Sequence, residues 1–279
     1  MATSLIEATV TTSTVLAAGV PTTVHDAGAG RPLVLLHGSG PGVSAWANWS
    51  GVLPDLATDH RVVAPDLAGF GDSVAAPGTR YDMKLWVAQL IGLLDALGLA
   101  TATLVGNSFG GGLALAATLR HPDRFDGLVL MGTPAGEFAM TEGLRAGWYY
   151  EPDLDEMARI LRLFPHDPSV VTSAMVRQRY ESSARPGAQD AFRRLMPEPG
   201  PDGTVVRGVP EASLRTITTP ALVLHGREDA VIPVALGYRL LECLPHAELH
   251  VFGGCGHWVH VERPGRFVEL VRGFARGLA

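Results

Sequence analysis

The chain has 279 residues, of which 47% are apolar and 18% charged, and its formal net charge is −6. This composition predicts one large, soluble α/β core, and the lack of a basic cluster argues against nucleic acid as a partner. Residues Met1 to Ala18 contain no Lys or Arg and no unbroken apolar run, so we expect neither a signal peptide nor a membrane span there. Two cysteines, Cys243 and Cys255, form no disulfide framework and favour a reducing cytoplasm.

Strand-like and helix-like segments alternate along the first half of the chain, which predicts a mostly parallel sheet flanked by helices. The strand-like segments are short and apolar, and the helical ones have the spacing of an amphipathic helix or a run of small residues. The expected elements before residue 134 are a hairpin over Val15–Asp26, strands over Leu33–Leu36 and Arg61–Asp66, a helix over Met83–Leu97, a strand over Ala102–Val105, a helix over Gly111–Ala117 and a strand over Leu128–Met131.

The segment Gly106-Asn107-Ser108-Phe109-Gly110 joins an expected strand to an expected helix and has the pattern G-x-S-x-G. Such a tight turn needs glycine on both sides and lifts the serine hydroxyl out of the sheet, at the positive end of the next helix. We therefore expect Ser108 to be a nucleophile.

A tetrahedral intermediate at such a serine needs two backbone N–H groups as an oxyanion hole. One is expected from Phe109, the residue after the nucleophile. The other is expected from the loop His37–Gly42, which follows a core strand, with Ser39 as the favoured donor.

The region between Thr133 and about Thr218 lacks a strand-like run of consequence. Short helices are expected there after Pro152, Pro168 and Pro186, because proline is favoured in the first turn of a helix. We predict a core made of residues 1–133 and 218–279 and a helical cap over residues 134–217, inserted between strands. The stretch 197–203 is expected to be a loop within this cap.

The strand pattern resumes at Ala221–Gly226 and is followed by two acids, Glu228 and Asp229. A nucleophilic serine needs a base and the base an orienting acid, in the chain order Ser, Asp or Glu, His. Aspartate is the usual acid after this strand, which favours Asp229, although the spacing leaves Glu228 open.

A histidine follows the next strand, Leu249–Phe252, in the glycine-rich loop that contains His257. The carboxyl ends of parallel strands share one edge of the sheet, so His257 is expected beside the serine. The other histidines nearby, His250 inside a strand and His260 at the start of the last helical region, are weaker candidates. Cys255 is expected to be a small apolar packing residue, and no Cys, His or carboxylate cluster has metal-ligand spacing.

Three segments together resemble a known family, the meta-cleavage product hydrolases. They are His37–Trp49 with its Gly-Ser-Gly-Pro-Gly run, Gly106–Gly111, and Gly254–Trp258, and the similarity extends to the cap segment Arg179–Ser183. The loop 199–209 matches the family least. The family consists of α/β-hydrolases that split carbon–carbon bonds in ring-opened aromatic compounds.

The resemblance implies an α/β-hydrolase fold and hydrolysis of the C5–C6 bond of 2-hydroxy-6-oxohexa-2,4-dienoates to 2-hydroxypenta-2,4-dienoate and a carboxylic acid. The implied reaction requires no metal or organic cofactor, and family members commonly form homodimers or higher homo-oligomers. The cytoplasmic location and the lack of a membrane partner are expected from the cysteine usage and from the absence of an apolar span. The resemblance also implies roles for particular residues: Ser108, Asp229 and His257 as the triad, Asn48, Asn107, Arg179 and Trp258 around the dienoate, Phe164 packed on it, and Gly38 and Gly40 beside it. Helical periodicity alone leaves open whether Arg177 or Arg179 faces the pocket.

Two other functions fit parts of this pattern. A carboxylesterase or lactonase of the same fold needs only the triad, and a ligand receptor needs only the fold. A haloalkane dehalogenase is disfavoured because its nucleophile is an aspartate, whereas this turn contains Ser108.

Overall fold

A computed structural model describes residues 9–76, 78–196 and 205–278. In chain order its helices and strands are β1 Thr11–Ala17, β2 Val20–Ala27, β3 Pro32–Leu36, α1 Ala45–Trp49, α2 Leu53–Leu56, β4 Arg61–Pro65, α3 Met83–Ala96, β5 Ala102–Asn107, α4 Phe109–Arg120, β6 Phe125–Met131, β7 Glu137–Ala139, α5 Glu142–Trp148, α6 Leu154–Leu161, α7 Ser173–Ser183, α8 Ala188–Leu195, β8 Val205–Arg207, α9 Glu211–Leu214, β9 Ala221–Gly226, α10 Ala235–Cys243, β10 Ala247–Phe252, α11 Val259–Glu262 and α12 Pro264–Gly277.

The centre of the fold is one eight-stranded sheet in the order β1-β2-β4-β3-β5-β6-β9-β10. The strands β1, β2 and β4 pair antiparallel, and every pairing from β4 to β10 is parallel. Parallel strands place their carboxyl ends, and the loops that follow, at one edge. The α/β class and the mostly parallel sheet expected from the sequence are confirmed.

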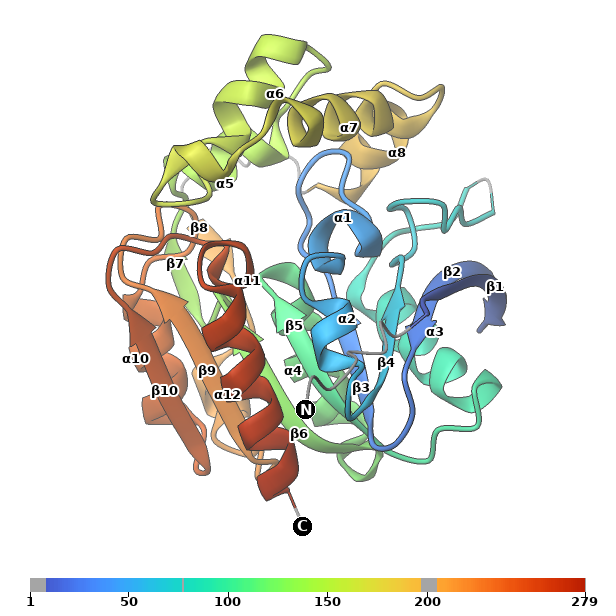
Figure 1. The fold of residues 1–279 in the computed structure, drawn as a ribbon, viewed down its shortest axis with the longest axis vertical. Coiled ribbons are helices and arrows are strands. Elements are labelled where there is room, and N and C mark those ends of the chain that lie inside the picture. The colour runs from blue at the N-terminus through green and yellow to red at the C-terminus, as the bar shows by residue number, and fades with distance from the viewer. Residues whose placement is uncertain (1–8, 77, 197–204, 279) are drawn as a thin grey trace, which may run out of the picture.

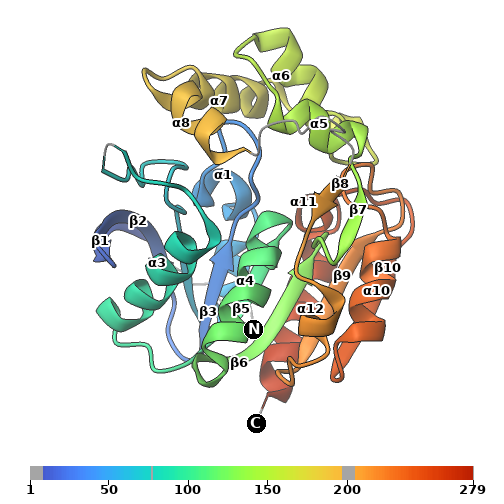
Figure 2. The same ribbon diagram turned by 180° about the vertical axis from the view of Figure 1, so that it is seen from behind.

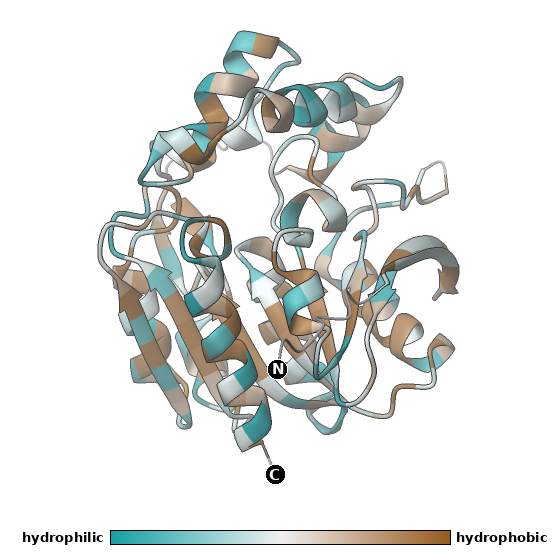
Figure 3. Cartoon of the chain, viewed as in Figure 1, coloured by the Kyte–Doolittle hydropathy of each residue, from teal (hydrophilic) through white to brown (hydrophobic). Residues whose placement is uncertain are grey.

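Both faces of the sheet are covered by helices, which explains why its central strands are continuously apolar. Along β3, Val34 and Leu36 pack into one cluster with α3, α4 and α10, whereas Leu33 and Leu35 pack into another with α1, α2 and α12. Figures 1 and 2 show the two helical layers from opposite sides, and Figure 3 shows the apolar strands between them.

The helices α5 to α8, residues 142–195, lie together above the carboxyl ends of the parallel strands (Figure 1), and we call this segment the cap. Its interior is a third apolar cluster, which includes Met157, Ile160 and Leu161 of α6 and extends to Val231 and Trp258 of the core. Side chains from both parts therefore meet above the sheet edge.

The structure differs from the expected elements in this region in two ways. The three-residue strands β7 and β8 pair antiparallel, although no strand of consequence was expected between Thr133 and Thr218. Pro168 begins a 3-10 turn, Pro168–Val170, and α7 starts only after the side-chain cap of Thr172. Strands of three residues are too short to show the alternation of apolar and polar residues that predicts a strand. The hydroxyl of Thr172 caps α7 and sets its start, although Pro168 favoured an earlier one. The expected loop over 197–203 lies outside the described residues, and the domain limits remain a prediction.

Candidate active site

Ser108 lies in the turn between β5 and α4, and its backbone is strained. Its φ of 53° and ψ of −112° are rare for a residue with a side chain and cost about 1–3 kcal/mol. A Cβ on Gly106 would lie 2.5 Å from the nitrogen of Gly111, and a Cβ on Gly110 would lie 2.1 Å from the carbonyl oxygen of Leu36. Both glycines are thus sterically required, and the serine is held at the N-terminus of α4.

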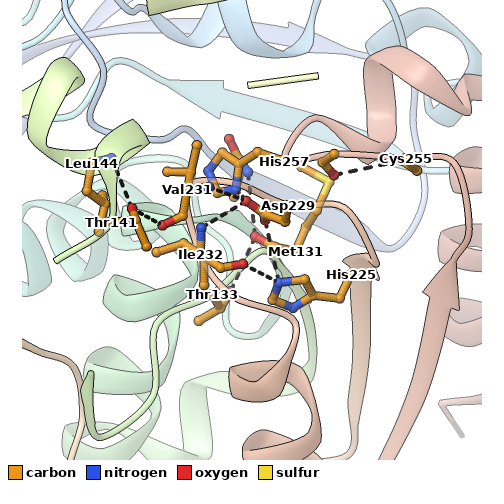
Figure 4. A network of polar contacts seen from close by, with 12 residues as sticks. Met131, Thr133, Thr141, Leu144, His225, Asp229, Val231, Ile232, Cys255 and His257 are labelled. Carbon is orange, nitrogen blue, oxygen red and sulfur yellow. Dashed lines mark hydrogen bonds and ion pairs between the residues drawn. The ribbon is translucent and has the colours of Figure 1, made fainter. Parts of the chain in front are cut away.

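His257 and Asp229 meet at the same sheet edge (Figure 4). Nδ1 of His257 lies 2.7 Å from Oδ2 of Asp229, and both side chains are almost fully buried. Because Nδ1 is bonded to the carboxylate, Nε2 is the ring nitrogen that is free to face a serine or a substrate. His257 and Ser108 line the same cavity. Glu228 instead bonds Nε of Arg227 and the backbone N–H of Cys255. The structure therefore brings Asp229, and not Glu228, to the imidazole.

The carboxylate of Asp229 is fixed by further donors. Its Oδ1 accepts the backbone N–H groups of Val231 and Ile232, each at 2.8 Å. Burial raises the pKa of Asp229, but the imidazoles of His257 and His225 beside the carboxylate outweigh burial and hold the pKa well below its usual range. The acid is therefore an anion at neutral pH and can stabilise an imidazolium.

The loop after β3 is held in place by two histidines. Nδ1 of His37 lies 2.7 Å from the carbonyl oxygen of Gly38, and its Nε2 accepts the N–H of Leu67. Nε2 of His260 lies 2.8 Å from the carbonyl oxygen of Asn48, and burial lowers the pKa of His260 to about 3. His260 is thus a neutral structural residue, which removes it as a rival base.

Two asparagines lie against this loop. Oδ1 of Asn48 accepts the N–H of Gly38 at 3.3 Å, and Oδ1 of Asn107 would lie 3.1 Å from a Cβ on Gly38. Both asparagines line the cavity together with Ser39 and Gly40. Ser39 and Phe109 both line the cavity space around Ser108, and their role as oxyanion donors stays a prediction.

Arg179 of α7 points into the same cavity, whereas Arg177 is exposed. The guanidinium is 6% exposed, and its Nε donates to the carbonyl oxygen of Pro41 at 2.9 Å. Burial lowers the pKa of Arg179 to about 10, so the side chain remains a cation at neutral pH. No carboxylate of the described residues lies within ion-pair distance of it. A buried cation without an anion indicates a place for an anionic ligand.

Phe164 of the cap and Trp258 of the core line the cavity together. Their rings stack at 5.0 Å, and Phe164 also contacts the ring of His257 at 5.7 Å. The carbonyl oxygen of Phe164 accepts the backbone N–H of His257 at 2.7 Å. The cap is therefore bonded directly to the loop that contains His257.

Two cavities meet at Ser108. The narrower, about 30 Å³, includes the polar side chains of Asn48, Asn107, Arg179 and His257 in its lining. The wider, about 520 Å³, is mostly apolar and runs along α4 past Gly112 and Ala116. Trp148 and Phe138 both line this wider cavity.

Sequence reasoning missed several residues that organise the site. Glu262 of α11 accepts the backbone N–H groups of Gly256, His166 and Asp167, and so joins the histidine loop to the segment after α6. His37 and His260 hold the loop after β3. These residues have no local motif, and only their position directly before or after a site loop could have suggested them. Cys255 is buried in the core as expected, and burial raises the pKa of its thiol to about 12.

Residues 31–264 match the family described as the alpha/beta hydrolase fold. A 2-hydroxymuconate semialdehyde hydrolase from Pseudomonas sp. strain CF600 is 46% identical over 93% of this chain and 92% of its own length. The meta-cleavage product hydrolase CumD from Pseudomonas fluorescens IP01, solved as a serine-to-alanine mutant complexed with acetates, has a TM-score of 0.90 and 44% identity, covering 95% of this chain and 97% of CumD.

The chain belongs to the meta-cleavage product hydrolases, within the α/β-hydrolase fold. A 2-hydroxy-6-oxo-2,4-heptadienoate hydrolase from Pseudomonas putida strain F1 is also 46% identical, over 93% of this chain and 94% of that protein. The resemblance noted in the sequence is thus confirmed. In the described part of the chain, no helix combines the length and apolar character needed to cross a membrane, and no three His, Cys, Asp or Glu side chains gather as a metal site.

Proposed function

We propose that this chain hydrolyses the C5–C6 bond of 2-hydroxy-6-oxohexa-2,4-dienoates, giving 2-hydroxypenta-2,4-dienoate and a carboxylic acid. The observation that supports this most directly is Arg179, a buried cation without a carboxylate partner among the described residues, in the cavity that also holds Ser108 and His257. An esterase needs the nucleophile and base, but it has no use for a buried anion receptor beside them. A dienoate supplies the missing carboxylate.

The carboxylate end of the substrate lies beside Arg179, at the narrower cavity. Arg179 binds the carboxylate through the two Nη groups, because its Nε is already bonded to Pro41. The amides of Asn48 and Asn107 bind the 2-oxygen, and Phe164 and Trp258 cover the flat diene. This arrangement holds the C6 carbonyl near Ser108 and fixes its orientation before reaction.

The reaction proceeds in two stages. The carbon–carbon bond of the dienol cannot break, because no electron sink lies next to it, so a proton first moves from the 2-hydroxyl to C5 by way of His257. Ser108, or a water activated by the same imidazole, then attacks the C6 carbonyl, and the N–H groups of Ser39 and Phe109 stabilise the oxyanion. Collapse expels the C5 carbanion as its stabilised enolate, and one water is consumed overall.

The group attached to C6 lies in the wider cavity. At about 520 Å³ this cavity exceeds the roughly 150 Å³ that encloses a benzene molecule, so a phenyl or longer alkyl group fits. Two arginines line it as well, but Arg207 is paired with Glu137 and Arg120 is bonded to the carbonyl oxygen of Ala116. The apolar lining therefore favours alkyl or aryl groups over a charged one.

The test is a kinetic panel of yellow ring-fission products with 6-methyl, 6-isopropyl, 6-phenyl and 6-carboxy groups. The enzyme should bleach the apolar substrates at catalytic rates, and Ser108→Ala should remove most of that rate. Faster turnover of aryl esters than of every dienoate would instead identify a carboxylesterase. Self-association remains a prediction from the resemblance, which sedimentation of the purified protein can test, and a cytoplasmic location remains a prediction from the cysteine usage.

A further inference from the structure

His225 is a second imidazole beside the carboxylate of Asp229, and the mechanism above gives it no role. It lies near the carboxyl end of β9, and its side chain is fully buried. Its Nε2 lies 2.8 Å from the carbonyl oxygen of Ile232 and 3.5 Å from Oδ2 of Asp229 (Figure 4). The acid of the triad is thus flanked by two histidines, His257 on the cavity side and His225 on the core side.

The contacts of His225 assign its proton to Nε2. A carbonyl oxygen can only accept, so Nε2 must donate to Ile232. The other ring nitrogen, Nδ1, is buried and has no hydrogen-bond partner among the described residues. A proton on Nδ1 would be a buried donor without an acceptor, which is costly, so the contacts favour the tautomer with its hydrogen on Nε2. His225 is therefore a fixed N–H donor rather than a second base.

Ile232 links this histidine to the acid. Its backbone N–H donates to Oδ1 of Asp229 at 2.8 Å, and its carbonyl oxygen accepts from His225. The imidazole thus fixes the peptide segment whose N–H binds Oδ1 of Asp229. The Nε2 atom of His225 also lies 3.5 Å from Oδ2, at the long limit of hydrogen bonding. Both oxygens of the acid depend on the position of this one ring.

The opposite side of the ring is closed by α10. A Cβ on Gly237 would lie only 2.9 Å from Nδ1 of His225, so the ring occupies the space that this glycine leaves free. Gly237 has an ordinary helical backbone, and the absence of a side chain is what the packing requires. Little movement of the ring is therefore possible.

We infer that His225 is a positioning residue that holds Asp229 in the orientation required by His257. When His257 takes the serine proton, the carboxylate must face the new imidazolium, and a rotated carboxylate would weaken that interaction. This inference rests on the triad assigned under the proposed function. It predicts that losing the Nε2 donor slows the chemical step and leaves substrate binding intact.

The decisive comparison is between His225→Leu, which removes the donor, and His225→Gln, which keeps an N–H near Nε2. The control is His60→Leu, because His60 is also buried, 3% exposed, but lies outside the site. Each variant is assayed with a 6-methyl dienoate and with p-nitrophenyl acetate. We expect His225→Leu to lower kcat tenfold or more on both substrates, since small misplacements cost up to about 10²-fold, with KM changed less than about twofold. His225→Gln should recover most of kcat, and His60→Leu should keep it.

Gly237→Ala serves as an independent variant should His225→Leu fail to fold. Alanine suits the helix, but its Cβ must displace the imidazole, so we expect a folded protein with reduced kcat. Parental kcat in folded His225→Leu or in Gly237→Ala would overturn the inference, as would a folded His225→Gln that recovers nothing. Hydrolysis of p-nitrophenyl acetate depends on the triad but not on recognition of the dienoate. A protein that cleaves no dienoate would therefore refute the proposed function, whereas the rates on the ester would still decide the role of His225.

Discussion

Arg179 donates from Nε to the carbonyl oxygen of Pro41 at 2.9 Å, which bonds the buried cation of the cap to the loop after β3. That loop approaches closely: a Cβ on Gly40 would lie 2.8 Å from an Nη nitrogen of Arg179, and a Cβ on Gly42 would lie 2.1 Å from its carbonyl oxygen. The glycines of this loop therefore allow α7 to pack closely against the core. The hydrogen bond to Pro41 orients the guanidinium before a ligand binds.

Replacing Arg179 with Gln should weaken recognition of the dienoate carboxylate. A hydrogen bond to a charged group contributes about 1.5–3 kcal/mol, which corresponds to a loss of roughly 10- to 100-fold in kcat/KM. Arg177→Gln is the matched control on the same helix and should stay within about twofold, because Arg177 is exposed. Steady-state kinetics with a dienoate and with a neutral aryl ester measure the effect, and an equal loss on the ester would argue against a carboxylate-binding role.

Asp229→Asn should nearly abolish catalysis, whereas Glu228→Gln should not. The aspartate orients His257 through Nδ1, and loss of the corresponding interaction in a serine triad lowers kcat by about 10⁴-fold. Glu228 bonds Arg227 and Cys255 at the outer side of the same turn. Single-turnover bleaching of the dienoate separates the two variants, and a large loss in Glu228→Gln would show that the acid has been assigned to the wrong residue.

Ala116→Leu should change substrate preference without changing the chemistry. Ala116 lines the wider cavity about two turns along α4 from Ser108, so a larger side chain shortens the space for the C6 substituent. We expect kcat/KM for the 6-phenyl substrate to fall by roughly tenfold or more, equivalent to about 1.4 kcal/mol, and that for the 6-methyl substrate to change little. Ala116→Ser is the control of nearly parental size. Equal losses on both substrates would mean that the substituent lies elsewhere.

Glu262→Ala should lower both the free energy of unfolding and kcat. The carboxylate accepts three backbone N–H groups, one beside His257 and two in the segment after α6. Its loss should lower the free energy of unfolding by about 2 kcal/mol, and kcat should fall because the histidine loop loses a support. Urea denaturation and kinetics measure the two effects. Glu269→Ala, on the exposed face of α12, should show neither effect.

The stability of the protein should depend on pH through His260. Burial lowers its folded-state pKa to about 3, below the unfolded value near 6.5, so the unfolded chain binds more protons between these values. Stability is therefore complete above about pH 6.5 and decreases as pH falls toward 3, by up to about 1.4 kcal/mol per unit. Burial lowers the pKa of His37 in the same sense. The free energy of unfolding, measured with urea between pH 5 and 6.5, should change less with pH in His260→Gln than in the parent protein. An identical pH dependence would contradict this account.

The nucleophile turn and the histidine loop could be predicted from sequence because their chemistry is local. The glycines around Ser108 and His257 and the apolar strands before them stand next to each other in the chain. The resemblance then supplied Asn48 and Arg179, which no short motif contains. The mostly parallel sheet could be predicted from the alternation of strands and helices, although the order of its strands was not.

What the sequence could not show depends on contacts between distant segments. Arg177 and Arg179 occupy one helix, and only the packing of α7 on the Pro41 loop decides which of them is buried. The pairing of β7 with β8 joins residues about seventy positions apart through three-residue strands. The partners of His225 and Glu262 are backbone groups, which leave no trace in the identity of the neighbouring side chains.

The bond between the carbonyl oxygen of Phe164 and the N–H of His257 has a consequence for engineering. Arg179 belongs to the cap and Ser108 to the core, yet the loop of His257 is anchored to both. We expect a chimaera that exchanges only the cap between relatives to transfer recognition of the substrate carboxylate without activity. The loop that contains His257 has to be exchanged as well, so that the backbone hydrogen bond to Phe164 is kept.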